Sequence, residues 1–492
     1  MRLVILGEAA REFSESVAYY ESNPMLRSEF MRCMPHFLLL TLTAFGQAGA
    51  NDRWSEVDRI SAAAVASGNF SGVSVAILGK NTSFVRGYGQ ADRESGRAVT
   101  PEDTFHLGSV SKLFTAIAVV ELCEQGVLGL DQEASQWLTE LPAAEWKGVT
   151  LRRLLSHSSG VPEYDKAEFE KITSSAVDPN TSWTLERLAG RRPEFTPGEQ
   201  WRYSNAGFNL LTLIVQRASG ESYGRFLSSS IAGPMKLSSV HLCSEEPAGT
   251  RASKGYIKGE QGYESNALWR LPSLKGEGGV CATPGDLARL PGALRRLLRE
   301  PSLRILRAPT ILNNGMQVDY GLGVRRGTIE GVQFWGHTGS IQSAIAVLAH
   351  FPERELTIAV LVNTTEGAQD AAGLFEEIAR AALNVSRTPR LVPASLPADA
   401  AARFAGDFQE NDRRIRIRFE DDKIVRSVVG SAKPAVTLIY LGNDTFGRKD
   451  YPGDRTRFGV VAGRTEGLSF YYNGLFFDFA PRMEAPAAPR GD

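Results

Sequence analysis

The sequence predicts an α+β fold, in which an antiparallel sheet is flanked by helices and is followed by a small C-terminal β-barrel. Three observations support this. Over residues 51–384, hairpin patterns and long helical patterns come in separate blocks, which favours an antiparallel sheet with helices packed on it. Residues 385–398 are rich in Pro and Ser and are typical of a linker. Over residues 399–492, short strand patterns alternate with turn residues, as in a small barrel.

The composition is that of an ordinary globular protein. The chain has 492 residues, of which 42% are hydrophobic and 23% charged. These values exclude a collagen-like, globally disordered or multi-span membrane protein. Lys and Arg number 55 against 56 Asp and Glu, so the formal net charge is −1. A balance this even gives no reason to expect nucleic acid as a partner.

Residues 1–50 are expected to be upstream residues and a signal peptide. Their only strong apolar run, 33–46, is shorter than the roughly 20 residues that a membrane-spanning helix needs. Two arginines precede the run and a small-residue cleavage pattern ends at Ala50, which predicts export and a periplasmic or secreted mature chain without a stable membrane span. Because the first 24 residues are polar and acidic, the true start is expected at Met25 or Met31. The alternative is that the run forms a buried helix.

Strand patterns open and close the large domain, and helical patterns lie between them. Residues 72–92 predict two strands around a Gly-Lys-Asn turn. A helix is predicted over 109–126, where apolar residues recur at spacings of three and four before a glycine. A second helix is predicted over 205–220, with Asn205 as its N-cap and Gly220 after its end. Three late strands are expected at 321–328, 342–351 and 356–363.

The C-terminal segment reads as all-β. Residues 413–419 alternate between arginines on one face and apolar side chains on the other. The arginine face either binds a partner or is a solvated strand face, and the second interpretation is favoured. Turn signals recur at Gly430, Gly442-Asn443, Pro452-Gly453, Gly463, Gly467 and Asn473-Gly474.

The cysteines and histidines indicate neither a disulfide scaffold nor a metal site. The four cysteines contain no C-x-x-C pair, and Cys33 leaves with the signal peptide, so at least one thiol stays free. Cys123 and Cys281 lie in apolar stretches and are expected to be buried as small hydrophobes. The six histidines lack metal-ligand spacing.

The first chemical motif is Ser109-Val110-Ser111-Lys112. On a helix, positions i and i+3 share a face, so a desolvated Lys112 can take the proton of Ser109. Ser109 would begin the helix, where the dipole favours a developing negative charge. The alternative is a serine that caps the helix, with an exposed lysine one turn later.

The second motif is Tyr203-Ser204-Asn205, ahead of the second helix. A phenol beside a cation can relay a proton, and the Asn205 amide can orient a substrate carbonyl. The alternative is a capping turn with a packed aromatic ring.

The third motif is Gly336-His337-Thr338-Gly339-Ser340, next to the late strands. His337 and Thr338 offer donors for a substrate carboxylate, and Gly339 lets a substrate lie against a strand edge. The N–H of Ser340 can complete an oxyanion pair with that of Ser109. The alternative is a β-turn or bulge with a surface histidine.

Together and in this order, the motifs make residues 70–365 resemble the class C β-lactamase-like serine hydrolases, which include DD-peptidases, D-aminopeptidases and esterases. Residues 399–483 are similar to the lipocalin-like barrel often appended to such hydrolases. The resemblance implies a β-lactamase/transpeptidase-like fold for the large domain. The segments that carry it are Phe105–Lys112, Leu154–Pro162, Pro197–Asn205, Gly278-Gly279-Val280 and Tyr320-Gly321-Leu322-Gly323.

The resemblance implies a role for each motif residue. Ser109 attacks the substrate carbonyl and becomes acylated, Lys112 takes or holds the proton, and Tyr203 passes it to the leaving group and later activates water. Asn205 positions the acyl chain. The substrate-side residues are His337 and Thr338, which steer a carboxylate or support Tyr203, Gly339 at the strand edge, and the N–H groups of Ser109 and Ser340, which hold the oxyanion. No metal or other cofactor is implied.

The predicted function is therefore an exported serine hydrolase that cleaves an ester, amide or peptide bond through an acyl-enzyme on Ser109. Its partners would be small molecules or peptides, including cell-wall fragments, with D-amino-acid and β-lactam compounds as candidates. His337 stands where class C β-lactamases carry lysine, and a neutral histidine is a weaker anchor for a β-lactam carboxylate. This favours an esterase, D-aminopeptidase or DD-carboxypeptidase over a true β-lactamase. The competing hypothesis is a catalytically retired, penicillin-binding-like protein that binds or regulates.

Overall fold

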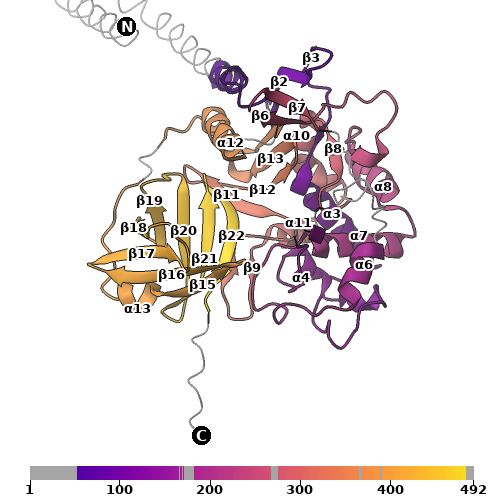
Figure 1. The fold of residues 1–492 in the computed structure, drawn as a ribbon. Helices are drawn as coiled ribbons and strands as arrows, with labels where there is room; N and C mark the ends of the chain where they lie inside the picture. The colour runs from indigo at the N-terminus through magenta and orange to yellow at the C-terminus, as the bar shows by residue number, and fades with distance from the viewer. Residues whose placement is uncertain are drawn as a thin grey trace, which may run out of the picture. The chain divides into compact units, whose positions relative to one another are not determined.

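The computed structural model describes residues 53–165, 167–168, 170, 182–266, 275–364, 368–387 and 391–483 (Figure 1). The chain divides into two compact units, Met1–Asp58 and Arg59–Asp492, and all elements discussed below lie in the second. The predicted signal peptide, cleavage point and alternative starts lie outside the described residues. Within the described part of the chain, no helix has the length and apolarity that crossing a membrane requires.

The sheet of the large domain is antiparallel and runs in the order β11-β12-β13-β14-β1-β2-β3. The predicted hairpin over 72–92 is confirmed as β1 and β2, and β1 pairs with β14 near the other end of the domain. The strands expected over 342–351 and 356–363 are confirmed as β13 and β14. The strand bounds are β1 Gly72–Gly79, β2 Thr82–Asp92, β3 Arg97–Ala98, β11 Arg325–Ile329, β12 Val332–Ile341, β13 Ala344–Phe351 and β14 Leu356–Val362.

Two features of this sheet differ from the expectation. The strand expected over 321–328 begins only at Arg325, because the glycines before it form a tight turn. The strand β12 was not predicted, although it contains the whole Gly336–Ser340 motif. Two glycines in that motif weaken the strand pattern, and their backbones lie against neighbouring main chain where a side chain would not fit.

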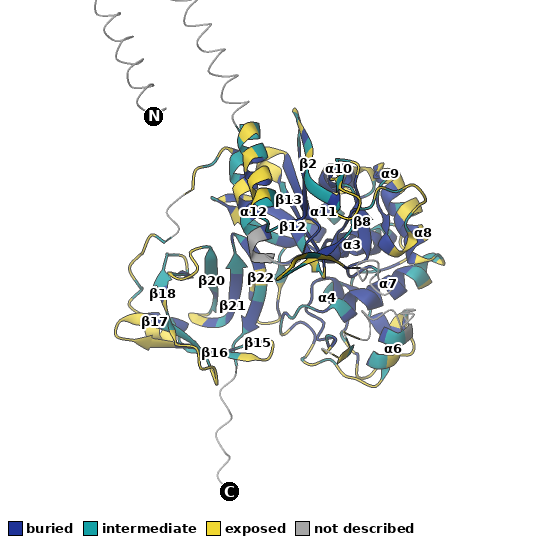
Figure 2. Ribbon diagram, turned by 45° about the horizontal axis from the view of Figure 1, so that its top comes forward, coloured by how far each residue is buried: buried dark blue, intermediate teal, exposed yellow. Residues whose placement is uncertain are grey.

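Helices cover both faces of the sheet, which explains why β13 and β14 are buried along nearly their whole length (Figure 2). The ring of Phe375 on α12 packs on Phe334 of β12, with 6.0 Å between centroids. On the other face, Leu348 and Leu361 belong to the same core as the helices α3 and α10. The helix bounds are α3 Ser111–Glu124, α4 Leu151–Leu155, α6 Ser182–Ala189, α7 Asn205–Ser219, α8 Tyr223–Phe226, α9 Gly233–Met235, α10 Pro284–Ala293, α11 Glu300–Arg307, α12 Ala368–Leu383 and α13 Ala400–Phe404.

The two predicted helices are present with small shifts. The helix expected over 109–126 consists of a 3₁₀ turn, η1 (Gly108–Val110), followed by α3, and Gly126 adopts a left-handed conformation after its end. Helix α3 is buried on nearly every side, so it is a core helix rather than an amphipathic one. The N-cap of α7 is Ser204, whose hydroxyl accepts from Gly207 N at 3.0 Å; Asn205 was expected there.

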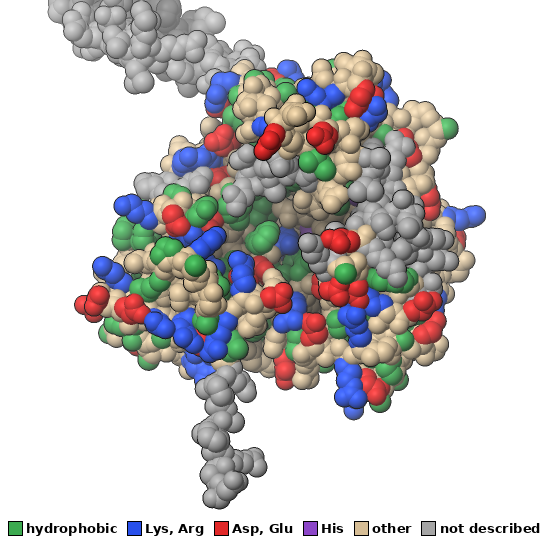
Figure 3. Space-filling model, viewed as in Figure 1, with side chains coloured by type: hydrophobic (Ala, Val, Ile, Leu, Met, Phe, Trp, Pro, Cys, Tyr) green, Lys and Arg blue, Asp and Glu red, His purple; other side chains and the backbone are tan. Residues whose placement is uncertain are grey.

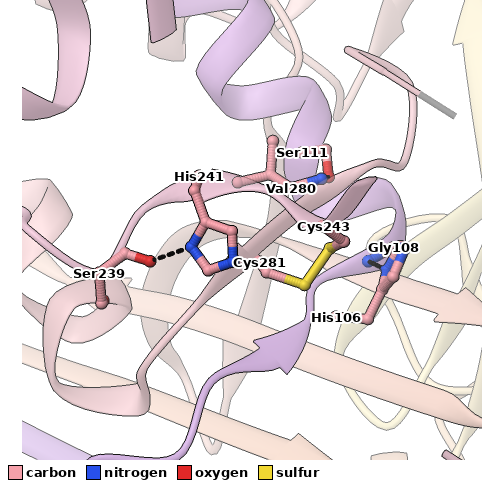
Figure 4. Close-up of a disulfide and its surroundings, with 8 residues drawn as sticks. All are labelled: His106, Gly108, Ser111, Ser239, His241, Cys243, Val280 and Cys281. Carbon is pink, nitrogen blue, oxygen red and sulfur yellow. Dashed lines mark hydrogen bonds between the residues drawn. A yellow bond between two sulfur atoms is a disulfide. The ribbon is translucent and has the colours of Figure 1, made fainter. Parts of the chain in front are cut away.

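A small sheet supports the segment that leads into η1. It has the order β4-β8-β5, and a disulfide joins Cys243, which directly follows β5, to Cys281 in β8 (Figure 4). Cys281 is buried as expected but is disulfide-bonded, whereas Cys123 is a free thiol that is only half-buried. The remaining short strands of the large domain are β4 Phe105–His106, β5 His241–Leu242, β6 Tyr256–Gly259, β7 Gly262–Ser265, β8 Val280–Ala282, β9 Thr310–Ile311 and β10 Gln317–Val318.

The C-terminal segment is an antiparallel meander from β15 to β22, and its pairing is that of a sheet rather than of the predicted closed barrel. Among the described residues, β15 and the end of β22 are joined by a single bridge, between Phe408 and Arg482, and no ladder closes the ring. The predicted turn at Gly467 is also wrong, since Gly467 lies inside β21. The strand bounds are β15 Gly406–Glu410, β16 Arg413–Glu420, β17 Lys423–Val428, β18 Val436–Tyr440, β19 Thr445–Arg448, β20 Asp454–Val461, β21 Arg464–Tyr472 and β22 Leu475–Pro481.

The arginine face of the predicted strand over 413–419 is locally neutralised. Arg414 and Arg416 both contact the carboxylate of Asp407, at 2.5 and 2.7 Å, and Arg418 lies 3.4 Å from Glu420. This supports the interpretation of a solvated strand face. On the opposite face, Ile415 and Ile417 are buried in the core of the meander, as the alternation predicts.

The C-terminal sheet continues the sheet of the large domain. Gly327 of β11 pairs with Leu475 of β22, and Thr328 N donates to Gly474 O at 2.9 Å. A Cβ on Gly327 would lie 2.4 Å from Gly474 O, so the close approach requires a glycine. Behind this contact, Asp319 accepts from the Tyr471 hydroxyl at 2.6 Å and lies 2.9 Å from Arg457. The C-terminal strands are therefore joined to the large domain through main chain and side chains.

Candidate active site

The structure brings the Ser109 hydroxyl and the Lys112 amine together. Ser109 lies on η1, and Lys112 lies in the first turn of α3, so the two side chains point the same way, with 3.1 Å between Oγ and Nζ. The small sheet fixes this segment: Leu107 N donates to Val280 O at 2.9 Å, and the Ser111 hydroxyl accepts from Val280 N at 3.0 Å. Ser109 is half-buried and Lys112 is fully buried.

The partners of Lys112 orient its amine toward the serine. Nζ lies 2.7 Å from Asn205 Oδ1 and 2.7 Å from Glu277 O, and both of these oxygens can only accept. They take two N–H bonds of the amine, so its third position faces Ser109 Oγ. That position holds a lone pair when Lys112 is neutral and a proton when it is charged. The geometry therefore suits an amine that takes a proton from Ser109 and later returns it.

Two glutamates that the sequence analysis did not single out, the buried Glu277 and the half-buried Glu163, interact electrostatically with this amine. Glu163 accepts hydrogen bonds from the backbone N–H groups of Tyr164 and Asn205, and burial raises the pKa of its carboxyl. Burial also raises the pKa of Glu277 to about 8, with Lys112 opposing the shift and Glu163 adding to it. Each glutamate directly adjoins a segment that carries the family resemblance, and that adjacency was the available signal.

The raised pKa of Glu277 predicts a pH-dependent stability difference. Its pKa rises from 4.5 to about 8 on folding, so its contribution to stability is fully present below pH 4.5 and is lost as the pH approaches 8. Glu277→Gln should therefore become more stable than the wild type by roughly 1.4 kcal/mol per pH unit across this window. Denaturant unfolding at pH 5, 7 and 9 measures the difference. The exposed Glu264→Gln is the matched control, and a pH-independent difference at Glu277 would contradict the argument.

The ring of Tyr203, rather than its hydroxyl, lies beside the Lys112 amine. Lys112 Nζ is 4.8 Å from the ring centroid, and the imidazole of His157 packs on the ring at 4.2 Å between centroids. Among the described residues, the Tyr203 hydroxyl has no hydrogen-bond partner, so it does not bond to Ser109 or Lys112 in this structure. Tyr203 is half-buried, and its hydroxyl is available to a substrate or water.

His337 is placed differently from the expectation that it contacts a substrate carboxylate. It is fully buried; Nε2 lies 3.0 Å from the Tyr320 hydroxyl, and Nδ1 lies 2.6 Å from Thr338 O. The same hydroxyl lies 3.1 Å from Nε2 of His157, whose Nδ1 accepts from Ser204 N at 3.1 Å. Both ring nitrogens of His337 are therefore occupied by protein groups, and its ring lies 6.5 Å from that of Tyr203 between centroids.

The hydrogen-bond partners of His157 and His337 assign one tautomer to each histidine. Ser204 N–H donates to His157 Nδ1, so His157 Nε2–H donates to the Tyr320 oxygen. The Tyr320 hydroxyl then donates to His337 Nε2, and His337 Nδ1–H donates to Thr338 O. Burial holds the pKa of both histidines well below its usual range and that of Tyr320 well above. These hydrogen bonds therefore form a neutral network that connects the second motif to the third.

The edge of β12 lies against the nucleophile segment, as the predicted oxyanion pair requires. A Cβ on Gly339 would lie 1.9 Å from Leu107 O and 2.8 Å from Ser109 N. A Cβ on Gly108 would lie 2.9 Å from Ser340 N. Only glycines allow this approach, which places the backbone nitrogens of Ser109 and Ser340 close together. Figure 3 shows a hollow on one face of the molecule, with the blue of Lys or Arg in its depth.

The predicted site residues thus divide into two groups. Ser109, Lys112 and Asn205 are hydrogen-bonded together, with Tyr203 stacked beside them. Thr338 is half-buried and Ser340 is exposed on β12, and His337 lies behind them. No group of three or more His, Cys, Asp or Glu side chains in the described part of the chain could hold a metal ion.

Comparisons with known proteins find matches over most of the large domain. Residues 57–383 match the family described as Beta-lactamase. Penicillin-binding protein 4* of Bacillus subtilis is 29% identical over 314 residues, which cover 60% of this chain and 69% of that protein. Esterase EstB of Burkholderia gladioli is 31% identical over 188 residues, 35% of this chain and 48% of the esterase, so the match spans about half of its length.

Solved structures extend the likeness into the C-terminal sheet. The octameric penicillin-binding protein homologue from Pyrococcus abyssi superposes with a TM-score of 0.60 at 19% identity. The match covers 86% of this chain and 99% of that chain. At this identity the likeness concerns the fold alone.

Proposed function

Because the chain belongs to the beta-lactamase family, we propose that it is an exported serine hydrolase that forms an acyl-enzyme on Ser109 and cleaves an ester or amide bond. One observation carries the proposal: Ser109 Oγ lies 3.1 Å from a buried amine whose other two positions are taken by obligate acceptors. A serine beside such an amine is activated for attack on a carbonyl carbon. The intact pair argues against a retired site.

The proposed reaction has two halves. Ser109 Oγ attacks the substrate carbonyl while its proton passes to neutral Lys112, and the N–H groups of Ser109 and Ser340 hold the oxyanion. The bond to the leaving group then breaks, and that group takes the proton from Lys112 by way of the Tyr203 hydroxyl. In the second half, water gives a proton to the same relay, attacks the ester and releases a carboxylic acid, and Ser109 recovers its proton.

The substrate class follows from the side of the site near β12. His337 is neutral and buried, so it cannot anchor a carboxylate as a lysine would. We therefore favour an ester or a peptide-like amide, including one with a D-amino acid, over a β-lactam turned over rapidly. Two relatives support acyl transfer of this kind, since one is named a penicillin-binding protein and the other an esterase.

The proposed location is the periplasm or the exterior. The buried disulfide Cys243–Cys281 supports it, because structural disulfides persist mainly in oxidising compartments. The predicted signal peptide points the same way. Cell-wall fragments are substrates that such a location would supply.

Covalent labelling tests the proposal. A fluorophosphonate and a fluorescent penicillin should each acylate or phosphonylate the protein once, and peptide mapping by mass spectrometry should place the adduct on Ser109. The variant Ser431→Ala, which removes an exposed serine of the C-terminal sheet, is the matched control and should label like the wild type. An adduct on another serine would overturn the mechanism. No adduct with either probe would favour the binding or regulatory alternative. A parallel screen with nitrocefin, p-nitrophenyl esters and D-amino-acid anilides identifies the bond that is cleaved.

A further inference from the structure

Arg325 on β11 carries a buried positive charge whose hydrogen-bond partners are main-chain carbonyl oxygens. Its side chain is part of the interior, with the residue 7% exposed. Nη1 donates to Phe476 O at 2.8 Å and to Phe477 O at 2.7 Å, Nε has no partner, and no carboxylate of the described residues forms an ion pair with it. A buried charge held only by carbonyl oxygens costs free energy that an anion would offset. A structural arginine would be expected to have such a partner.

The guanidinium lies over the ring of Tyr203. Arg325 Cζ is 5.5 Å from the Tyr203 ring centroid and 5.8 Å from that of Phe477, an exposed side chain of β22. The Tyr203 ring therefore has two cations near it, Arg325 and Lys112, at 5.5 and 4.8 Å. His337, which stands where class C β-lactamases carry lysine, is neutral.

We propose that the C-terminal sheet completes the active site: the carbonyls of Phe476 and Phe477 on β22 hold Arg325 against Tyr203, where its positive charge stabilises the deprotonated phenol. This rests on the proposed function, in which Tyr203 moves a proton. A cation near an acid favours the charged form of that acid, so Arg325 supplies from β11 the charge that β12 lacks. Arg325 is thus a positioning residue that acts through Tyr203.

The other groups around Tyr203 do not supply the positive charge that we assign to Arg325. The titratable groups that face the ring are Lys112 from α3, His157 after α4, and His337 from β12, together with Tyr320, whose hydroxyl is held between the two histidines. Both histidines are neutral, and the Lys112 amine is hydrogen-bonded to Ser109. On the far side, Asp478 interacts electrostatically with Arg325, but burial raises the pKa of that carboxyl. Arg325 is therefore the charge near Tyr203 with no other assigned use.

The β22 strand is held firmly enough to position Arg325. It pairs with β11 at Gly327, two residues after Arg325, and Phe476 and Phe479 are buried with Trp201 and Tyr320 in one apolar cluster. Strand β22 and Tyr203 thus share a packed core. This explains why the C-terminal sheet is continuous with the large domain rather than tethered by a linker alone.

Arg325→Met tests the proposal because it removes the charge and keeps an apolar side chain of similar length. Removal of the unpaired charge is stabilising, whereas loss of the donor of Phe476 O and Phe477 O is destabilising, so the melting temperature should change little. The kcat/KM for a p-nitrophenyl ester should fall about 10- to 100-fold, and the pH at which kcat/KM reaches half of its plateau should rise by about one unit. Arg325→Lys keeps the charge and should retain the wild-type pH profile. Arg418→Gln, on the exposed face of β16, is the control and should leave kcat/KM and its pH profile unchanged.

Three outcomes would overturn the proposal. One is a folded Arg325→Met with the wild-type kcat/KM and pH profile. Another is a lowered melting temperature with an unshifted profile, which marks a structural arginine. The third is a rise in KM confined to substrates that carry a carboxylate, which means that Arg325 binds substrate. Failure of the proposed function is recognised separately, because Ser109→Ala would then keep its activity and its label.

Discussion

Ser109→Ala is expected to lower kcat/KM by at least about 10³-fold and to abolish covalent labelling. Among the described residues, the variant removes the only oxygen that contacts Lys112 Nζ and could become acylated, since the other two contacts are an amide and a main-chain carbonyl oxygen. The N–H groups of Ser109 and Ser340 remain, so residual turnover above the rate in water is expected from the oxyanion pair. Progress curves with a p-nitrophenyl ester, together with gel fluorescence after penicillin labelling, measure both effects.

The interpretation of Ser109→Ala depends on an intact fold. Ser109 is half-buried and lies on a 3₁₀ turn, so loss of one hydroxyl should leave the melting temperature nearly unchanged. Ser109→Cys is an informative companion, because a thiol beside the same amine should still form a covalent adduct, though with altered kinetics. Activity of Ser109→Ala within tenfold of the wild type, in a folded protein, would show that catalysis takes place elsewhere.

The elements that the sequence predicts well are those whose pattern and boundary signals agree. The hairpin β1–β2 has a Gly-Lys-Asn turn between two apolar runs, and α7 ends at Gly220 in the left-handed conformation. Strand β12 was not predicted because its glycines have low strand propensity. They are needed there for close backbone contacts. The disulfide was not predicted because pairing Cys243 with Cys281 needs the β4-β8-β5 sheet, which residue patterns alone do not reveal.

In the candidate site too, local contacts could be predicted from the sequence and long-range contacts could not. The spacing of Ser109 and Lys112 on one turn is local, so the contact follows from the sequence once the helix is granted. Asn205 and Tyr203 come to the same place only through the packing of α7 on α3. The roles of Tyr320, Glu277 and Arg325 depend on burial and on partners from distant strands. The residue type of His337 left two roles open, a substrate contact or support of Tyr203, and only its burial on β12 shows that it is part of a neutral hydrogen-bond network.

The electrostatic balance around Lys112 links these observations. The half-buried Glu163 and the buried Glu277 both interact with the Lys112 amine, and the pKa of each is raised by loss of solvent, with Lys112 opposing the shift. Each glutamate that ionises favours the charged ammonium, and each that is protonated favours the neutral amine. The protonation state of the base therefore depends on the pair of carboxyls as well as on Ser109.

Lys112→Met should slow acylation by about 10²- to 10⁴-fold, because it removes the proton acceptor of Ser109 and leaves the hydroxyl in place. Stopped-flow mixing with a chromogenic ester measures the acylation step. An arginine is not a substitute, since it stays protonated and cannot accept the proton.

The same substitution should disturb its surroundings in a recognisable way. Asn205 Oδ1 and Glu277 O lose their 2.7 Å donor and are left unpaired in a buried site, which costs about 1–3 kcal/mol for each lost partner. Because Lys112 opposes the raised pKa of Glu277, its removal should raise that pKa further and keep the carboxyl protonated to higher pH. Glu277→Gln in the Lys112→Met background should therefore change stability more with pH than it does alone, because the stability difference keeps growing above pH 8. Acylation by Lys112→Met within tenfold of the wild-type rate, in a folded variant, would mean that another group takes the proton of Ser109.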